Sequence, residues 1–487
     1  MMNKKILYPL LALIVLGICV RFSVARLTLN SILSAEYYYI LNAVQPVFLG
    51  IFLMYVFAKL DFNRWAKIAK WLVAASFLAL IPAIFLGTRH AGAGAYSMIN
   101  FGIFGLNTGE FTKFAALIFL ARYFSNKAET RTGILKNLLI PGIIYLGYYN
   151  LLLLQRDFSA ILIITVLYVA VYFTAAAKRK HAWIFVGYLG FLFSLMILSY
   201  PSRFIDKATI LFNPWADPNG SAYQLVQSLI AIGSNGLWGS GIGNSLQKYS
   251  YLPGCRTDTI FAIFAEECGL IGVGLLLVLY FWIFYQIVKV AVKSNEFGRL
   301  LCLGFSILFM VPIVFHIGAV AGVLPFMGVR LPFVSYGSNN IMFLLAGFGI
   351  IMNISKQSGL VDNEGVLLNS GQTRKFSVLT AILFSILFLR IIYIQTVMAK
   401  TKQLGMRAFN RHFVVTPDSL AIDSDSVVSV ETSQKDYPAL QKIYKANPGA
   451  TERELFKAVK SLKTFKLCAV DSSARLIPNS PYNRAIE

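Results

Sequence analysis

The sequence is poor in charged residues. Only 14% of its 487 residues are Asp, Glu, Lys or Arg, while 57% are hydrophobic. An average soluble chain has about 25% charged residues. The shortage of charge excludes an ordinary soluble protein, because too few polar side chains are available to cover a water-exposed surface.

Cysteine is also rare, with five copies, at Cys19, Cys255, Cys268, Cys302 and Cys468. They are scattered without the close spacing of metal ligands, so we predict no metal site from them. Cys255 and Cys468 lie outside the apolar blocks, where a disulfide is chemically allowed in an oxidising compartment. Nothing in the sequence brings these two residues together, and we do not expect them to pair.

Acidic residues are half as numerous as basic ones, 22 against 44, which gives a net charge of +22. Such an excess can indicate nucleic-acid binding. Here much of the positive charge stands in short connections between apolar blocks, where it orients a membrane protein and binds anionic lipid. We therefore expect no nucleic-acid partner.

The hydrophobic residues are gathered in blocks of about 20, the length at which a helix crosses a hydrocarbon core of about 30 Å. About eleven blocks can be counted, near residues 6–24, 40–58, 67–87, 111–123, 137–154, 158–177, 182–200, 259–290, 299–325, 338–354 and 376–398. The blocks predict an all-α polytopic membrane protein.

Lys and Arg cluster in every second connection, and such connections stay on the cytoplasmic side during insertion. The basic connections are at residues 4–5, 59–70, 122–136, 178–180, 289–299 and 356–375. We therefore expect a cytoplasmic N-terminus in a cytoplasmic (inner) membrane. An odd eleventh span would place the C-terminal tail outside.

The longest external connection, residues 201–258, is rich in aromatic, Gly, Asn and Gln residues. Apolar residues at 223–230 recur at helical spacing, which predicts a helix docked on other elements. Gly236–Gly243 permits tight turns and close approach of the backbone to a ligand. The run has neither the preceding strand nor the following soluble helix of a nucleotide-binding loop, so nucleotide binding is excluded.

Three carboxylates follow this connection. Asp258 stands directly before an apolar block, and Glu266 and Glu267 lie inside it. Acidic groups within a span are costly and are usually functional or paired. For Asp258 the structural alternative is an N-cap of the following helix. For Glu266 and Glu267 it is an ion pair inside the bundle.

Several motifs together resemble the SEDS family (shape, elongation, division and sporulation). They are Asn213–Gly220, Tyr223-Gln224, Gln227-Ser228-Leu229, Gly236–Gly243, Lys248, Leu252-Pro253, Thr257-Asp258, Phe261-Ala262, Glu266–Gly269, Leu331–Gly337, Gly109-Glu110 with Lys113, and Gln155 with Asp157. They stand in the order of that family across residues 1–355. Features around the glycine run are more similar to the FtsW and SpoVE branch than to the RodA branch.

The resemblance implies a ten-span helical core and a peptidoglycan glycosyltransferase that polymerises lipid II during division or elongation. It also implies that Asp258 is essential. The chemistry suits this residue, because an acceptor sugar hydroxyl must lose a proton as it attacks a donor with a lipid-linked diphosphate leaving group. The usual partner of the family is a class B penicillin-binding protein, together with divisome or elongasome proteins.

A diphosphate needs compensating charge. We expect Lys248 and Arg256, or a divalent ion such as Mg²⁺ or Mn²⁺, to supply it; the alternative is that both side chains reach lipid headgroups. Lys113 and Glu110 either bind substrate or neutralise each other at i and i+3. Further candidate substrate ligands begin spans from the outside, where helix capping is the alternative role; they are Gln155, Asp157, Ser335 and Tyr336.

The sequence also departs from the family. Arg156 stands in place of Pro, Ser159 of Gly, Gly254 of Glu, Ser338-Asn339 of Gly-Ser, and Ala95-Tyr96 of Arg-Trp. The expected catalytic Asp258 is kept.

Beyond the core we expect a cytoplasmic linker at residues 356–375, an extra transmembrane helix at 376–398 and an external appendage at 399–487. Arg390 to Gln395 and residues 407–421 resemble the juxtamembrane start of a class B penicillin-binding protein. The transpeptidase itself is absent, since the tail holds no Ser-x-x-Lys or Lys-Thr-Gly. We expect a small α+β or partly disordered tail, with one amphipathic helix at residues 452–462.

Two other functions share this topology. A flippase for a lipid-linked precursor would not need Asp258. A scaffold for a class B penicillin-binding protein would carry no chemistry at all. Substitution of Asp258 separates both from the glycosyltransferase.

Overall fold

A computed structural model describes residues 3–25, 44–87, 97–100, 105–126, 134–175, 179–218, 220–248, 252–358, 370–398, 413–416, 419–424, 426–432 and 465–469. The chain divides into two compact units, Met1–Gln395 and Thr396–Glu487, which are described separately below.

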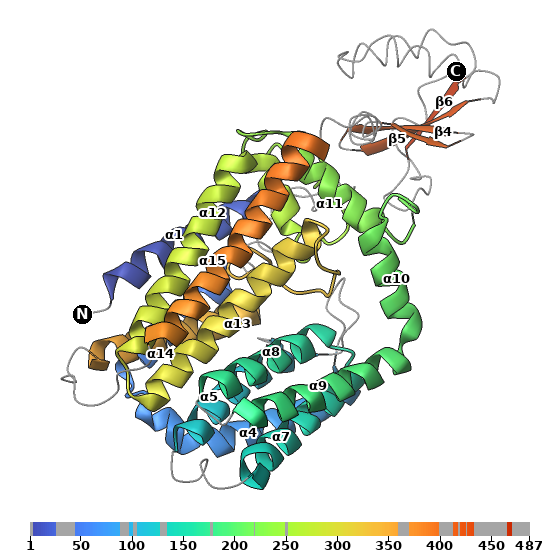
Figure 1. Ribbon diagram of the computed structural model, residues 1–487. Helices are drawn as coiled ribbons and strands as arrows, with labels where there is room; N and C mark the ends of the chain where they lie inside the picture. The colour runs from blue at the N-terminus through green and yellow to red at the C-terminus, as the bar shows by residue number, and fades with distance from the viewer. Residues whose placement is uncertain are drawn as a thin grey trace. The chain divides into compact units, whose positions relative to one another are not determined.

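The first unit is a bundle of helices that run side by side (Figure 1). Its helices are α1 (Lys4–Ala25), α3 (Gln45–Lys59), α4 (Asn63–Leu86), α5 (Thr108–Ser125), α7 (Ile134–Leu154), α8 (Phe158–Thr174), α9 (Arg179–Ser199), α10 (Pro201–Phe212), α11 (Tyr223–Ser234), α12 (Ile260–Val292), α13 (Glu296–Val320), α14 (Ser338–Ser358) and α15 (Ser370–Tyr393). A π-helical turn, Ile394–Met398, follows α15.

Each of the eleven apolar blocks overlaps one of these helices. Among the described residues, six helices are long and apolar enough to cross a membrane, or seven if the pair α9 and α10, bent by 94°, is one span. Three shorter apolar helices lie at Gln45–Lys59, Leu138–Leu154 and Phe158–Thr174. The helical membrane architecture is therefore confirmed, whereas ten core spans plus one stays a prediction.

Helices form here because a chain in hydrocarbon must satisfy its backbone groups internally. Several of them begin with a side-chain cap. Asn107 accepts a hydrogen bond from the amide of Glu110 at 3.0 Å, Asp157 from Ala160 at 3.0 Å and Asn295 from Gly298 at 2.8 Å. Each cap satisfies one of the four amides that a helix start leaves unpaired.

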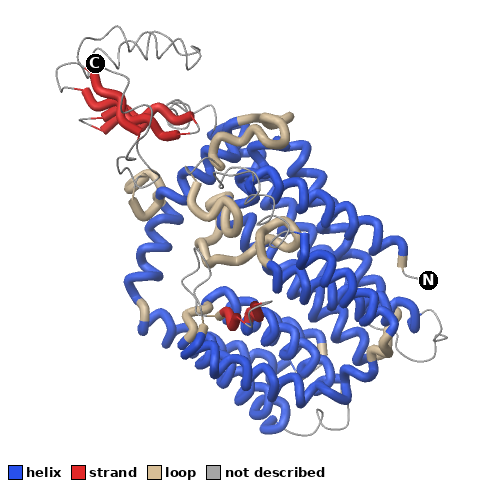
Figure 2. The backbone as a smooth tube through the Cα atoms, turned by 180° about the vertical axis from the view of Figure 1, so that it is seen from behind, coloured by secondary structure: helices blue, strands red, loops and turns tan. Residues whose placement is uncertain are grey.

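The core of the first unit lies around α13, which packs against α5, α8 and α12. α14 packs along α3, and α15 lies on α12 and α13 (Figure 1). A short hairpin, β1 (Met98–Asn100) and β2 (Gly105–Asn107), pairs antiparallel and leads directly into α5. Figure 2 shows this hairpin in red among the helices.

α12 is broken at Gly269, whose φ of 63° and ψ of −167° are not helical. The glycine run 236–243 fills the break. The amides of Ser240 and Gly241 donate to the carbonyls of Glu266 and Glu267 at 3.0 and 2.9 Å. In return, the amides of Leu270 and Ile271 donate to the carbonyls of Gly236 and Leu237, at 3.2 and 3.3 Å. The close backbone approach allowed by these glycines is therefore to another segment of the chain.

The second unit contains an antiparallel sheet in the order β3-β4-β5-β6. Its strands are β3 (Phe413–Thr416), β4 (Ser419–Ser424), β5 (Ser426–Thr432) and β6 (Phe465–Ala469). Strands in the tail agree with the expected α+β appendage, whereas β1 and β2 add a short hairpin to the expected all-α membrane core. The amphipathic helix expected at 452–462 lies outside the described residues.

Cys255, in the first unit, is a free thiol.

Candidate functional site

Asp258 stands on a tight turn before α12. The carbonyl of Gly254 accepts hydrogen bonds from the amides of Thr257, Asp258 and Thr259, at 2.9, 3.0 and 3.1 Å. Gly254 itself has a φ of 68°, a conformation that glycine adopts without steric cost. Gly254, which stands in place of the Glu of the family, is therefore suited to this turn.

The carboxylate of Asp258 does not cap α12. The N-cap residue is Thr259, which makes no side-chain cap bond; its hydroxyl donates instead to the carbonyl of Pro253 at 2.9 Å. The alternative role of Asp258, as the N-cap of α12, is therefore wrong. Its carboxylate is available for another role.

Two residues of the loop after α13 hold this turn in place. The Ser335 hydroxyl donates to the carbonyl of Thr257 at 2.8 Å and accepts from the amide of Leu331 at 2.9 Å. The amide of Tyr336 donates to the carbonyl of Arg256 at 3.0 Å, and its hydroxyl donates to the carbonyl of Arg21 at 2.8 Å. Both side chains are buried. Ser335 and Tyr336 thus fix the position of the loop that carries Asp258.

The electrostatic setting of Asp258 is a balance of two effects. Burial raises the pKa of this carboxyl above its usual value, while the charge of Arg330 and a hydrogen bond from Thr257 act in the opposite direction. Asp258 also lies close to Gly328, since a Cβ atom placed there would be 3.9 Å from Oδ2. A carboxylate with a raised pKa next to a cation is typical of a functional site.

Arg330 is the functional candidate that sequence reasoning missed. It acts electrostatically on both Asp258, in the turn before α12, and Glu110, in the first turn of α5. Its guanidinium packs over Gly337, where an added Cβ would stand 3.2 Å from Nη1. The imidazole Nδ1 of His316 lies 2.8 Å from the carbonyl of Val329 and anchors this segment to α13. No local signal marks Arg330, because its significance depends on the loop that brings it to Asp258.

A polar cavity of about 60 Å³ lies beside Arg330. Residues from the starts of α5 and α8, from α13 and α14 and from the loop after α13 line it; they are Ser97, Asn107, Gly109, Glu110, Lys113, Asp157, Ser159, Ala160, Ile163, Pro312, Gly328, Val329, Arg330 and Asn340. A cavity with so many polar groups has room for several water molecules.

Glu110, Lys113 and Asp157 meet in one cavity, a juxtaposition that the sequence did not predict. Lys113 pairs with Glu110 at 2.7 Å, so these two charges compensate each other. Asp157 caps α8 and also accepts from the hydroxyl of Ser159 at 2.7 Å. Gln155 is fully buried behind them, donating to the carbonyl of Leu80 at 2.8 Å. Substrate binding by these residues stays a prediction.

Lys248 lies in a separate buried cluster. Its ammonium pairs with Glu267 at 3.2 Å and donates to the hydroxyl of Ser23 at 3.2 Å and to the carbonyl of Gly243. Glu266 accepts from the hydroxyl of Ser245 at 2.6 Å and from backbone amides of residues 246 and 247. These contacts favour a structural role for Lys248, and the ion pair expected inside the bundle is present at Glu267.

The carboxylates of the cavity do not form a resident metal site. Among the described residues no three His, Cys, Asp or Glu side chains gather as metal ligands. Glu110 is paired with Lys113, and Asp157 is used as a helix cap. A divalent ion that accompanies a diphosphate substrate is a separate matter and stays a prediction.

Comparison with known proteins extends the sequence resemblance. The FtsW/RodA/SpoVE family model, described as "Cell cycle protein", matches residues 4–359. Stage V sporulation protein E of Bacillus subtilis is 30% identical over 351 residues, which are 72% of this chain and 95% of that protein. The probable peptidoglycan glycosyltransferase FtsW of Coxiella burnetii is 34% identical over 360 residues, which are 72% and 94%.

Solved structures agree with the fold. A chain from the structure described as "Structural coordination of polymerization and crosslinking by a peptidoglycan synthase complex" superimposes with a TM-score of 0.60 at 25% identity, covering 73% of this chain and 98% of that one. Rod shape determining protein RodA of Thermus thermophilus has a TM-score of 0.54 at 23% identity, covering 73% and 97%. The family match ends at residue 359, so α15 and the second unit lie beyond it.

Proposed function

Since the chain belongs to the FtsW/RodA/SpoVE family of cell cycle proteins, we propose that it is a peptidoglycan glycosyltransferase that polymerises lipid II at the outer face of the cytoplasmic membrane. Relatives of this chain carry that activity in their names. Within the structure, the setting of Asp258 supports the proposal: its carboxylate does not cap α12, and it lies near Gly328 and Arg330, two residues that line the polar cavity.

Asp258 acts as the general base in this proposal. The acceptor sugar hydroxyl gives its proton to the Asp258 carboxylate while the hydroxyl oxygen attacks the anomeric carbon of the donor. The bond from that carbon to the diphosphate oxygen breaks, and the lipid-linked diphosphate leaves with the electron pair. A diphosphate whose charge is compensated is already a good leaving group, so no second carboxylic acid of the glycosidase kind is needed.

Arg330 supplies the compensating charge. Arginine binds phosphate oxygens through two parallel N–H donors. Lys113, which lines the same cavity, already has a carboxylate partner, Glu110, at 2.7 Å. Arg330 has no such partner: among the described residues, no carboxylate oxygen forms an ion pair with its guanidinium within 4.0 Å. We place Arg330 ahead of Lys248 as the diphosphate ligand, with Arg256 as a second cation on the turn.

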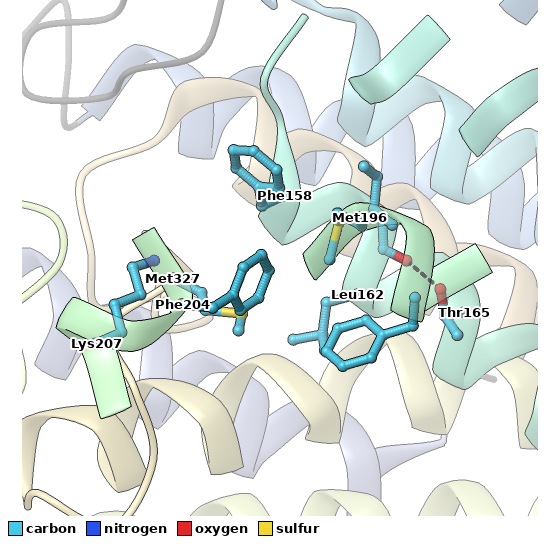
Figure 3. Close-up of a pocket in the computed structure, with 9 residues that line it drawn as sticks. Phe158, Leu162, Thr165, Met196, Phe204, Lys207 and Met327 are labelled. Atoms are coloured by element: carbon cyan, nitrogen blue, oxygen red, sulfur yellow. Dashed lines mark hydrogen bonds between the residues drawn. The ribbon is translucent and has the colours of Figure 1, made fainter. Parts of the chain in front are cut away.

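In this proposal the lipid chain of the substrate binds in an apolar cavity next to the polar one. A cavity of about 70 Å³ lies between α8, α9 and α10, lined by Phe158, Leu162, Met196 and Phe204, with Lys207 (Figure 3). Met327 lines it as well, directly before the Gly328 of the polar cavity. Neighbouring apolar and polar cavities suit a molecule that joins a hydrocarbon chain to a diphosphate.

A class B penicillin-binding protein is the partner that we propose. A structural neighbour of this chain comes from a complex that couples polymerization to crosslinking. The described segments here show no transpeptidase fold. A polymerase of this kind needs a separate crosslinking enzyme, together with proteins of the division or elongation machinery.

Purified lipid II and detergent-solubilised full-length protein test the proposed function. In detergent no bilayer has to be crossed, so a flippase produces no new covalent product. Glycan polymer from the native chain, alone or with an added transpeptidase, is the expected result. A native chain that yields no polymer under both conditions, with Mg²⁺ or Mn²⁺ supplied, would favour the flippase or the scaffold.

A further inference from the structure

Arg390 stands in the last turn of α15, the helix that lies beyond the family match. Its Nε donates to the carbonyl of Ala321 at 3.2 Å, and its guanidinium carbon lies 5.5 Å from the centre of the Tyr393 ring. A charged group near the end of an apolar helix is costly unless it is paired or reaches a polar surface. Here it reaches the end of another helix of the bundle.

Ala321 is the C-cap residue of α13, directly after its last residue, Val320. The next three amides turn back onto the helix: Gly322 donates to Ala319 at 3.1 Å, and residues 323 and 324 donate to Gly318 at 2.8 and 3.0 Å. Gly322 has a φ of 67°. A Cβ placed on it would lie 3.8 Å from Nη2 of Arg390. The end of α13 is thus covered by Arg390.

The same helix end also lies against α11. The same Cβ on Gly322 would be 3.5 Å from Leu225 and 3.8 Å from Leu229. These leucines belong to the apolar face of α11, which is buried. The end of α13 is therefore in contact with both α11, part of the family core, and α15, which is not.

The segment that begins at this helix end leads to the site. Residues 321–330 run from Ala321 to Gly328, Val329 and Arg330, which line the polar cavity. Their far end is fixed by His316 at Val329 and by Ser335 at Leu331. Their near end is fixed by the bonds of the α13 terminus and by Arg390. The position of Arg330 relative to Asp258 depends on both ends.

We propose that α15 supports the active site in cis, with Arg390 as a positioning residue that fixes the Ala321 carbonyl and thereby the segment carrying Arg330. The inference rests on the proposed function for its effect on catalysis, but its structural part does not. It gives the added span a role in the site: a helix outside the family core completes the bonding of a loop inside it.

Amide hydrogen exchange of the purified full-length chain tests the structural part. In Arg390→Ala, the amides of residues 322–324 should exchange at least about tenfold faster, because a hydrogen bond from a charged donor is lost. Arg390→Lys keeps a charged donor and should restore much of the protection. Leu389→Ala, on the lipid-facing side of α15, should leave these amides unchanged. Unchanged exchange in Arg390→Ala, or an equal increase in Leu389→Ala, overturns the inference.

Polymerisation by the same proteins tests the link to the site. Arg390→Ala should lower kcat/KM by roughly tenfold or more, in line with the lost hydrogen bond, with rescue by Arg390→Lys. Faster exchange with a native kcat/KM in Arg390→Ala would refute the positioning role. If the native chain makes no polymer, the proposed function has failed, and the exchange experiment still decides whether Arg390 fixes the segment.

Discussion

At the scale of single residues, the chemistry of the site depends on which charges already have partners. Lys113 is paired with Glu110, and Lys248 with Glu267, in buried or nearly buried settings. Arg330 acts electrostatically on two carboxylates, Asp258 and Glu110, and within the described part of the chain it forms no ion pair of 4.0 Å or less with either. The cation that faces Asp258 is therefore the one best placed to receive a diphosphate.

The charge of Arg330 sets the pH dependence of Asp258. Burial raises the pKa of this carboxyl, and Arg330 holds it lower than burial alone would. A general base works only when ionised, so activity is lost as the pH falls through this pKa. In Arg330→Gln the pKa rises further, and the acid limb of the kcat/KM profile should move to higher pH. Arg330→Lys keeps the charge and is the matched control; an acid limb that does not move in Arg330→Gln contradicts the assignment.

Lys248 and Glu267 predict a stability effect. Lys248→Met leaves the Glu267 carboxylate buried without its cation, which should cost about 3–5 kcal/mol of unfolding free energy. The double variant Lys248→Met with Glu267→Gln should recover much of that loss. Thermal unfolding in detergent measures both. If Lys248→Met keeps its stability but loses substrate affinity, Lys248 is a ligand after all.

Asp258 could be selected from the sequence because the surrounding motifs resemble a known family; its residue type and place alone left the N-cap role open. Arg330 could not be selected in this way. It stands in a different loop, and only the packing of Ser335 and Tyr336 on residues 256 and 257 brings the two loops together. The partners of Lys248 were equally hidden, since Glu267 was known to be intramembrane but not to face it.

At the scale of elements, the break in α12 at Gly269 lets the glycine run 236–243 form hydrogen bonds with this helix. Gly239 and Gly269 meet backbone to backbone, and a Cβ on Gly239 would stand 2.3 Å from the carbonyl oxygen of Glu267. Contacts of this kind leave no room for any side chain. The glycine run is thus a clamp on α12 that keeps residues 244–248 against Glu266 and Glu267.

Gly239→Ala should destabilise the fold by more than about 1–3 kcal/mol, the usual cost of a non-glycine residue in a strained conformation, because the contact with Glu267 adds to it. Gly142→Ala is the matched control. Gly142 lies inside α7 with nothing within 4 Å of an added Cβ, so the same change should stabilise by up to about 1 kcal/mol. Equal stability of the two variants, measured by thermal unfolding, would rule out the clamp.

The helices themselves were predictable, because an apolar block of about 20 residues has no other way to satisfy its backbone in hydrocarbon. The break at Gly269 was not. The sequence around it is continuously apolar apart from the two acids, and the hydrogen bonds that compensate the break come from a loop some thirty residues earlier. The cap at Asp157 was the alternative role that its residue type and place indicated, whereas the cap at Asn107 was not predicted.

At the scale of the whole molecule, the charge pattern predicts the orientation. Basic connections alternate along the chain, which places the N-terminus in the cytoplasm and the tail outside. Alkaline phosphatase fused after Glu487 should be active, because it folds only outside the cytoplasm. The same enzyme inserted between α14 and α15, at residues 359–369, should be inactive. The opposite pair of results would invert the topology and move Asp258 to the cytoplasmic face.

The division of the chain was only partly predictable. The composition of residues 399–487 indicated a small appendage, and the sheet β3–β6 agrees with an α+β tail. The junction with α15 followed from hydropathy. The contact of Arg390 with the end of α13 did not, because a single hydrogen bond between helices far apart in the sequence leaves no pattern in either.

We propose that Asp258 is the general base of a lipid II polymerase. The most direct test compares glycan polymer made from purified lipid II by the native chain, Asp258→Ala and Asp206→Ala, an exposed aspartate of the same external connection. We predict a loss of about 10²–10⁴-fold in Asp258→Ala, the contribution of a positioned base, and none in Asp206→Ala. Equal polymer from the native chain and from Asp258→Ala would contradict the assignment.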